Sequence, residues 1–480
     1  MEKMVRHPNL LFVFSDQQRY SALGANGNNV IHTPTLDSLA ASGITCDNMF
    51  SNHPLCSPYR AMLLSGQYAW QNLVIDNEYR LRRDVPTLPG TLRDNGYHTG
   101  QVGTWHLGMG PYNEKDRYGL DYLATNYPSP VPNMHGGYYN SNYYENELGP
   151  IHYEGWTPKI ETDLAIKFME GHLDTQFGNP FALFVSWRPP HWPYADYPEE
   201  YAMYNPADVD LPGNVPEQMA DFARKEIADY YGCCSGLDAQ MARLLKALNR
   251  LGLSENTIVC YTSDHGDHLS SHGYGKPRDS WMHPSMRASK ATPYEESIHV
   301  PFIVRWPGAT PAGTRSDAFF GAIDLMPTLL GACGVPLPEG LQGRDVSSVW
   351  RGENTPADTE LTPGASESVY LQNMAHGWPN RDAWVGRWRG VRTEHWTYAR
   401  WYGNEDGPWL FDRKNDPLEM INLVESSESR PVVEEMEERL HRWMKATHDP
   451  FEYGRRGPRG FLDLGQLFAD PEKYPGWGTA

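Results

Sequence analysis

The chain has 480 residues, of which 40% are hydrophobic and 21% charged, and its formal net charge at pH 7 is −19. This length exceeds what one ordinary core uses, so we expect two domains, one large and one small. The negative charge argues against a nucleic-acid partner, because phosphate backbones demand a basic surface. No apolar run reaches the roughly 18 residues that a membrane span needs, so no membrane partner is expected.

The N-terminal region and the cysteines bear on where the protein works. The opening stretch MEKMVRHPNLLFVFSD has a short apolar run without a small-residue cleavage site, so we interpret it as a strand rather than a signal peptide. A chain already trimmed of its signal would look the same. The six cysteines show no disulfide framework, which favours reduced thiols. We therefore expect a cytoplasmic protein, or a periplasmic or secreted one if a signal was removed.

Five short apolar runs that end in polar residues predict buried strands. They are LLFVFSDQ (10–17), TGQVGTWHLG (99–108), FALFVSWRPPHWP (181–193), TIVCYTSDHGD (257–267) and VPFIVRWPG (300–308). Helical patterns lie between them, at 33–43 with a glycine stop and at 226–252. This alternation predicts an α/β fold with a large, mostly parallel sheet flanked by helices, and near-continuous apolar strands fit burial on both faces.

The C-terminal part has a different pattern. Residues 351–368 are rich in Pro, Thr, Gly and acids, which is typical of a linker or a long surface loop. Two segments within 382–423 predict antiparallel strands with aromatic faces, and 430–448 predicts an amphipathic helix. We therefore divide the chain into a large α/β domain over 1–365 and a smaller α+β subdomain over 366–480, which carries the antiparallel sheet, the helix and a surface tail.

The stretch NHPLCSPYRAMLLSG (52–66) holds the first candidate functional residue, Cys56. Pro58 is pre-set for the first turn of a helix, so Cys56 lies at a helix N-terminus, where free N–H groups favour an anion. Arg60 lies one turn further along and can lean back toward Cys56. A reactive group beside a cation and a helix dipole suits an anionic substrate. The alternative is that Cys56 is a buried thiol that caps the helix.

Polar pairs end two of the predicted strands, Asp16-Gln17 and Asp264-His265. Parallel strands would bring both pairs to one edge of the sheet, where folds of this class bind ligands. Two carboxylates, an amide oxygen and an imidazole could form the shell of Ca²⁺, Mg²⁺ or Mn²⁺. The alternative is that each aspartate caps the helix after its strand.

Histidines and aromatic residues complete the candidate site. His106 and His191 both follow predicted strands, and imidazole can donate to a developing oxyanion or protonate a leaving group near neutral pH. A lone histidine is more often a satisfied core residue, but two at strand ends beside an anion site favour catalysis. Trp192, Tyr194 and residues 135–149 could stack on a sugar or aryl group. They could equally be core or lid residues.

The stretch CSPYRAMLLSG resembles the Cys-x-Pro-x-Arg signature of the sulfatase family, which belongs to the alkaline-phosphatase-like superfamily. Other blocks resemble that family in the same order along the chain: NLLFVFSDQQR, VGTWHLG, PPHWPY, TSDHGDHLSSHG, PYEESIHVPFIVRWPG and LFDRKNDPLEMINL. The resemblance spans residues 9 to about 423, and several ordered blocks are far more specific than one. It implies a large α/β domain and a small C-terminal domain with an antiparallel sheet.

The resemblance also implies a role for each candidate residue. A separate maturation enzyme would oxidise Cys56 to formylglycine, whose hydrated aldehyde would attack sulfur. Arg60 would hold the hydrated aldehyde, and His106 would contact the formylglycine. One divalent metal would be needed, Ca²⁺ in first place, with Mn²⁺ and Mg²⁺ as alternatives. The metal ligands would be Asp16, Gln17, Cys56, Asp264 and His265.

His191 and a lysine would contact the sulfate oxygens and the leaving-group oxygen. The family places this lysine four residues before the tyrosine of YEES, which selects Lys290, and Lys276 is the rival. Two positions depart from the family pattern. Thr104 stands where the family usually has a lysine, which should weaken sulfate binding or mark a substrate that brings less charge. Gln17 stands where most sulfatases have a second aspartate, a feature that resembles the phosphonate monoester hydrolase and phosphodiesterase branch.

We therefore expect a sulfuric ester hydrolase that acts on an organic sulfate monoester, either a sulfated sugar or an aryl sulfate. One alternative is a phosphonate monoester or phosphodiester hydrolase on the same scaffold. The other, motivated by Thr104, is a non-catalytic carbohydrate-binding relative. The acidic charge favours small molecules or oligosaccharide ends over intact sulfated polymers.

Overall fold

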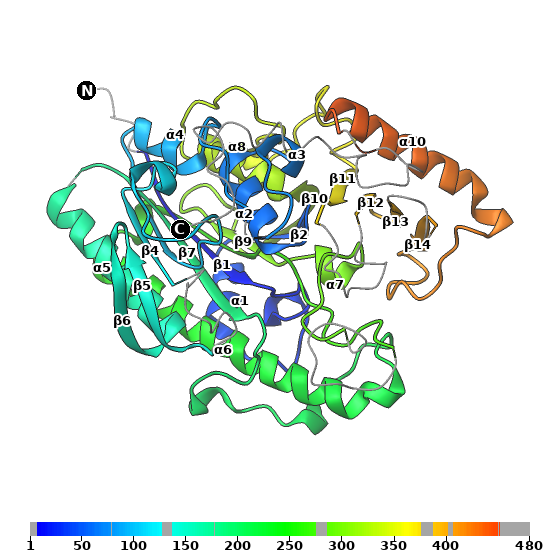
Figure 1. Cartoon of the computed structure of the whole chain (residues 1–480), viewed down its shortest axis with the longest axis horizontal. Helices are drawn as coiled ribbons and strands as arrows, with labels where there is room; N and C mark the ends of the chain where they lie inside the picture. Colours follow the sequence, from blue (N-terminus) through cyan, green and yellow to red (C-terminus); the bar gives the residue numbers. More distant parts are fainter. Residues whose placement is uncertain are drawn as a thin grey trace.

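The structure is a computed structural model that describes residues 7–451 except 78, 127–136, 177, 275–285, 376–386, 402–406 and 450. The described residues form a ten-stranded sheet with helices on both faces and a four-stranded sheet near the C-terminal end (Figure 1). This confirms the predicted α/β class and the antiparallel C-terminal sheet. The tail beyond residue 451 and the rival lysine, Lys276, lie outside the described residues.

The large sheet is mostly parallel, and its centre is the first strand of the chain. Its order is β10 (Thr314–Gly321), β2 (Ile44–Phe50), β9 (Phe302–Arg305), β8 (Thr257–Ser263), β1 (Asn9–Asp16), β7 (Phe181–Pro190), β3 (His98–Gly103), β4 (Tyr122–Thr125), β5 (Tyr139–Glu145) and β6 (Leu148–Trp156). Strands β8, β1, β7, β3 and β4 run parallel to one another. Strand β9 runs antiparallel to both of its neighbours. Strands β5 and β6 form an antiparallel hairpin, so much of 135–149 is strand rather than loop.

The burial of β1 on both faces explains its continuous apolar sequence. All eight of its residues are buried. Leu10, Phe12 and Phe14 point into one hydrophobic cluster, and Leu11 and Val13 into the other. Because side chains alternate along a strand, each face of β1 must meet a separate layer of helices.

The two helical layers follow from these clusters. Helices α1 (Pro34–Ala41), α5 (Thr157–Thr175) and α6 (Ala220–Arg250) pack on one face. Helices α2 (Cys56–Ser65), α4 (Leu88–Asp94) and α8 (Ala322–Ala332) pack on the other, as Figure 1 shows. The shorter helices are α3 (Ala69–Asn72), α7 (Glu295–Ile298) and α9 (Ser347–Trp350). The helices predicted at 33–43 and 226–252 are confirmed, and the second begins earlier, at Ala220.

The C-terminal sheet lies next to the large sheet, where β11 (Ser368–Asn373) contacts β10. Its strands are β11, β12 (Trp388–Thr393), β13 (Trp396–Trp401) and β14 (Trp409–Asp412), antiparallel and in chain order. Helix α10 (Arg430–Ala446) lies along this sheet, and Trp443 stacks on Tyr370. The backbone and side chain of Asn52 hydrogen-bond β11 at Gln372 N and Tyr370 O, at 2.8 and 2.7 Å. The C-terminal sheet therefore touches the segment that precedes Cys56, and the domain boundary at residue 365 stays a prediction.

Two properties of the described residues concern the chain's surroundings. None of their helices combines the length and the apolar composition required to cross a bilayer. All six cysteines are buried free thiols.

A buried carboxyl on α5 makes stability depend on pH. Burial raises the pKa of Glu161 to about 8, although the Tyr143 hydroxyl donates to its Oε1 at 3.1 Å. The folded chain therefore holds this proton more tightly than the unfolded chain does. Its contribution to stability is complete below about pH 4.5 and is lost as the pH rises to about 8.

Glu161→Gln keeps the shape of the protonated side chain and removes its titration. We expect the urea midpoint of the wild type to fall relative to that of Glu161→Gln as the pH rises from 5 to 8. The control is Asp174→Asn, on the exposed side of the same helix, which should follow the wild-type profile. Parallel profiles for the wild type and Glu161→Gln would contradict the prediction.

Candidate active site

Cys56 occupies the first position of α2, as its sequence predicts. The preceding residue, Leu55, is extended, Pro58 lies in the first turn, and the helix ends at Gly66, whose left-handed φ of 59° suits glycine. Every residue of α2 is buried, and Cys56 is 3% exposed. The N-terminus of the helix therefore places Cys56 in the interior, near the carboxyl ends of the central strands.

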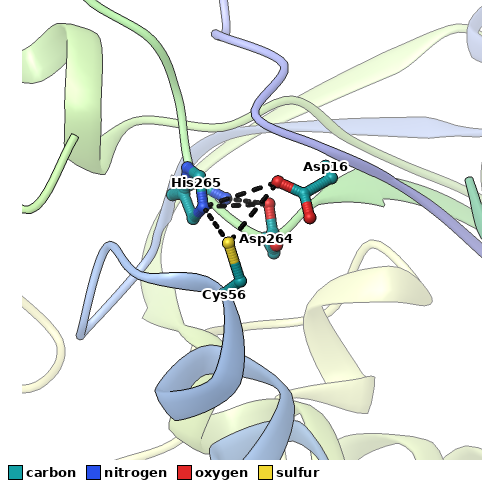
Figure 2. Close-up of side chains that lie close together, drawn as sticks. All are labelled: Asp16, Cys56, Asp264 and His265. Atoms are coloured by element: carbon teal, nitrogen blue, oxygen red, sulfur yellow. Dashed lines mark hydrogen bonds and ion pairs between the residues drawn. The ribbon is translucent and has the colours of Figure 1, made fainter. Parts of the chain in front are cut away.

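The two predicted carboxylates meet at the carboxyl ends of β1 and β8. Asp16 is the last residue of β1, and Asp264 directly follows β8, which pairs with β1 in parallel with Ser15 opposite Ser263. Together with Cys56 and His265 they offer ligand atoms that all lie within 4.8 Å of one another, and all four residues are buried. Figure 2 shows the four side chains pointing toward one another.

Arg60 balances the negative charge of these carboxylates. Its Nη2 donates to Asp16 Oδ2 at 3.1 Å and to Asp264 Oδ2 at 3.3 Å. Burial alone would raise the pKa of Asp16, but the charges of Lys290 and Arg60 hold that pKa below its usual range. Burial and the neighbouring charge of Asp16 raise the pKa of Asp264. The site therefore holds one firmly ionised carboxylate beside a second that shares the same cations.

Lys290 reaches the site from a segment far along the chain. It is 4% exposed, and its Nζ lies 3.3 Å from Cys56 Sγ and 2.8 Å from Gln17 Oε1. Lys290, the lysine selected from the sequence, thus contacts the candidate nucleophile, Cys56. A cation at this distance from residue 56 can bind an anionic group held there.

Asp267 is a site residue that the sequence patterns did not single out, and it contacts the candidate ligand Gln17. The Nε2 of Gln17 donates to Asp267 Oδ2 at 2.8 Å, and the Tyr194 hydroxyl donates to the same oxygen at 2.5 Å. A carboxylate accepts only, so this contact turns the oxygen of the Gln17 amide toward Lys290 and the site. The signal was present in the block TSDHGDHLSSHG, where Asp267 follows His265 by two residues.

His265 presents one ring nitrogen to the site as an acceptor. Its Nδ1 lies 3.0 Å from the carbonyl oxygen of Gly266, which can only accept, so Nδ1 carries the proton. Its Nε2 lies 3.3 Å from Cys56 Sγ and 3.5 Å from Asp264 Oδ1. Burial, helped by Lys290, lowers the pKa of His265 to about 3. A neutral imidazole with a fixed tautomer is the form that binds metals.

The other two candidate histidines lie at neighbouring strand ends. His191 directly follows β7, and its Nδ1 donates to the carbonyl oxygen of Trp192 at 2.7 Å. Burial and the charge of Lys290 lower the pKa of His191, so its imidazole is neutral near pH 7. His106 lies just beyond β3 and is buried, and its carbonyl oxygen accepts from Ser57 Oγ at 2.6 Å. The structure thus places His106 beside the residue that follows Cys56.

Thr104, which departs from the family pattern, serves the site through its backbone. Its carbonyl oxygen accepts from Arg60 Nη1 at 2.7 Å, and its buried Oγ1 has no hydrogen-bond partner among the described residues. Tyr194 is a core residue rather than a surface for stacking on a substrate, because it is 2% exposed and its hydroxyl donates to Asp267. Trp192 is partly buried, and the guanidinium of Arg287 lies 5.4 Å from its ring centroid.

The donors present fit a divalent metal. Two carboxylates, an amide oxygen and a neutral imidazole converge there, and oxygen-rich sets with one imidazole suit Ca²⁺, Mg²⁺ or Mn²⁺. The thiol of Cys56 fits less well as a reacting group, because burial and the charge of Asp16 raise its pKa and keep it protonated. The free thiol at position 56 is therefore held in its neutral form.

Comparisons with known proteins found two matching family models. A family model described as sulfatase matches residues 8–335, and a model described as N-sulphoglucosamine sulphohydrolase, C-terminal, matches residues 288–446. The chain is similar to an ulvan-active sulfatase of Formosa agariphila, with 30% identity over 453 residues. That alignment covers 93% of this chain and 82% of the relative.

Solved structures share the fold over nearly the whole chain. One, in complex with its substrate D-glucosamine-2-N,6-O-disulfate, superposes with a TM-score of 0.80 at 25% identity and covers 92% of this chain and 98% of that one. A phosphonate monoester hydrolase of Agrobacterium radiobacter superposes with a TM-score of 0.68 at 21% identity. It covers 92% of this chain and 96% of that one, and at this identity it shows the fold alone.

The Asp267–Gln17 contact predicts an effect on metal affinity. Asp267→Asn leaves one accepting oxygen where the carboxylate has two, although Gln17 Nε2, the Tyr194 hydroxyl and the Leu269 N–H all donate to residue 267. The orientation of the Gln17 amide is then no longer fixed with its oxygen toward the site. We expect the affinity for Ca²⁺, measured by isothermal titration calorimetry without substrate, to fall by about tenfold or more.

A second substitution provides the control. Gln17→Glu in the Asp267→Asn background restores a matched pair, in which the new amide donates to the new carboxylate. This double variant should recover much of the Ca²⁺ affinity. Ca²⁺ affinity that is unchanged in Asp267→Asn alone would exclude this role for Asp267.

Proposed function

The chain belongs to the sulfatase family, and we propose that it hydrolyses the sulfate ester of a sugar through a formylglycine made from Cys56 beside a divalent metal. The observation that carries the proposal is the position of Cys56 Sγ, 3.3 Å from both His265 Nε2 and Lys290 Nζ. A group at this position meets a metal-binding imidazole on one side and an anion-binding ammonium on the other.

The nucleophile requires a change at residue 56. The raised pKa of the Cys56 thiol opposes thiolate chemistry, whereas a hydrated aldehyde supplies a hydroxyl nucleophile. The partner that makes it would be a separate formylglycine-generating maturation enzyme. Because Cys56 is buried, that enzyme must reach it before the chain has folded.

The proposed reaction also needs a divalent metal held by the chain's own residues. When bound, a divalent metal would act as a Lewis acid at the reacting group. Ca²⁺ is the first choice, because oxygen donors dominate the set, and Mn²⁺ or Mg²⁺ are alternatives. Its ligands would be Asp16, Gln17, Asp264, His265 and residue 56.

The cations and the other histidines would handle the substrate. Arg60 neutralises Asp16 and Asp264 and would hold the hydrated aldehyde. Lys290 would bind a sulfate oxygen, since its ammonium already lies beside Cys56. His191 would contact the leaving-group oxygen, and His106 the formylglycine.

The proposed substrate is a sulfated sugar of modest size. Support comes from the relatives, one of which acts on ulvan and another of which binds a glucosamine disulfate. The net charge of −19 disfavours a long polyanion and favours a small sugar sulfate or the end of an oligosaccharide.

Gln17 favours a second candidate, a phosphonate monoester or phosphodiester hydrolase. A glutamine in place of a second aspartate makes the metal shell one charge less negative and strengthens its pull on electrons. Turnover of an aryl sulfate and of the matching aryl phosphonate by the mature protein separates the two. A large preference for the phosphonate would overturn the sulfatase proposal.

Removal of the nucleophile position gives a direct test. We expect Cys56→Ala to lower sulfatase kcat by about 10³-fold or more, because the covalent route needs an oxygen at this position. Cys333→Ala, which changes another buried cysteine at the end of α8, is the matched control and should keep its activity. Activity retained in Cys56→Ala would refute the assignment, and an unmodified Cys56 peptide in an inactive protein after co-expression with a maturation enzyme would favour the non-catalytic alternative.

Loss of a metal ligand should remove the metal and the activity together. Asp264→Ala deletes one of the two converging carboxylates, so we expect metal content measured by plasma mass spectrometry to fall to background. Asp174→Asn, at an exposed position of α5, should keep the wild-type metal content. A metal-free Asp264→Ala variant with full turnover would rule out the metal role.

A further inference from the structure

Lys290 lies in a short buried segment whose backbone conformation is costly. Residues 288–292 are all buried, and Ala288 and Ala291 have φ values of 52° and 65°. Non-glycine residues rarely adopt these left-handed values, and they persist only where the surroundings fix them. The position of Lys290 Nζ therefore depends on whatever holds this segment.

Two backbone hydrogen bonds fix this segment against loops that follow strands of the large sheet. The N–H of Ala291 donates to the carbonyl oxygen of Pro54 at 3.0 Å, which ties the segment to the stretch before Cys56. The carbonyl oxygen of Ser289 accepts from the N–H of His268 at 3.1 Å. These bonds fix both sides of Lys290 and leave the carbonyl group of Ala291 for another partner.

That partner is a tryptophan of the C-terminal sheet. Trp388, the first residue of β12, is fully buried, and its indole Nε1 donates to Ala291 O at 2.9 Å. Without this donor, the buried carbonyl of the residue next to Lys290 would lose its hydrogen bond. A buried unsatisfied carbonyl is costly, so the segment would shift to recover a partner.

A neighbouring tryptophan shows that packing alone does not require this bond. Trp401 on β13 lies opposite Trp388, and both belong to one hydrophobic cluster. The Nε1 of Trp401 is buried and has no hydrogen-bond partner among the described residues. Two tryptophans thus fill the same cluster, and the N–H of Trp388 is the one directed at the Lys290 segment.

We propose that Trp388 is a positioning residue for the sulfate-binding site. Its indole N–H holds Ala291 O and so keeps Lys290 Nζ between Gln17 and Cys56. The C-terminal sheet therefore completes a site whose other residues come from the large sheet and its helices. This inference rests on the proposed function, because it takes Lys290 as the cation that binds the sulfate group.

The test compares Trp388→Phe with Trp401→Phe. Each removes an indole from the same cluster, but only the first removes a hydrogen bond to the Lys290 segment. We expect Trp388→Phe to weaken binding of inorganic sulfate and to lower kcat/KM on 4-nitrophenyl sulfate by about tenfold. Trp401→Phe should change both by less than about twofold. Metal content should stay at the wild-type level in both variants.

A double variant separates positioning from a general loss of structure. If Trp388 acts through Lys290, then Trp388→Phe should cost little further sulfate affinity or turnover in a Lys290→Ala background. A structural role would give the same loss in both backgrounds. Should Trp388→Phe not fold, β-(3-benzothienyl)alanine at position 388 keeps the ring shape without the N–H and should give the same tenfold loss.

The outcomes distinguish this inference from the proposed function. A strong effect of Lys290→Ala with no effect of either change at position 388 would overturn the role of Trp388 and leave the sulfatase proposal standing. Equal losses in Trp388→Phe and Trp401→Phe, or additive losses with Lys290→Ala, would overturn it as well. No effect of Lys290→Ala on sulfate binding or turnover would overturn the inference together with the assigned role of Lys290. Failure of Cys56-dependent turnover would instead reject the proposed function itself.

Discussion

The close approach of two buried carboxylates, Asp16 and Asp264, is the constraint on which the rest of the site depends. They meet because β1 and β8 are parallel neighbours that end at the same edge of the sheet. Two buried like charges are costly unless cations or a metal compensate them. The fold supplies Arg60 from α2 and Lys290 from a distant segment, and both contribute to holding the pKa of Asp16 low.

The cations that compensate these two carboxylates come from elements outside the strands of the large sheet. Helix α2 brings Arg60 and Cys56 together, since they lie one turn apart on a fully buried helix. Lys290 lies on a segment in which Ala291 bonds Pro54 through its N–H and Trp388 of the C-terminal sheet through its carbonyl oxygen. The site therefore lies where both parts of the chain meet, and its charge balance depends on their packing.

Backbone strain gathers around the same point. Gln17 has a φ of 74°, and Ala291 one of 65°, although neither is glycine. Each is held by specific bonds: Gln17 N donates to Asp264 Oδ1 at 2.9 Å, and Ala291 is bonded through both its N–H and its carbonyl. Strained residues that persist beside a cluster of charges are typical of sites arranged for chemistry rather than for stability alone.

The sequence by itself determined the elements and the chemical types: buried β1 from its continuous apolar run, the helix start at Cys56, and acidic residues at the ends of β1 and β8. The resemblance to the family also selected Lys290, which the structure places beside Cys56. Only the tertiary structure decided that β9 runs antiparallel, that 139–156 form a hairpin, that Asp267 orients Gln17, and that Trp388 holds Ala291. The reason is physical: periodicity and capping report local burial, whereas the direction of a strand and the contacts between side chains of different elements arise only when the sheets and helices pack.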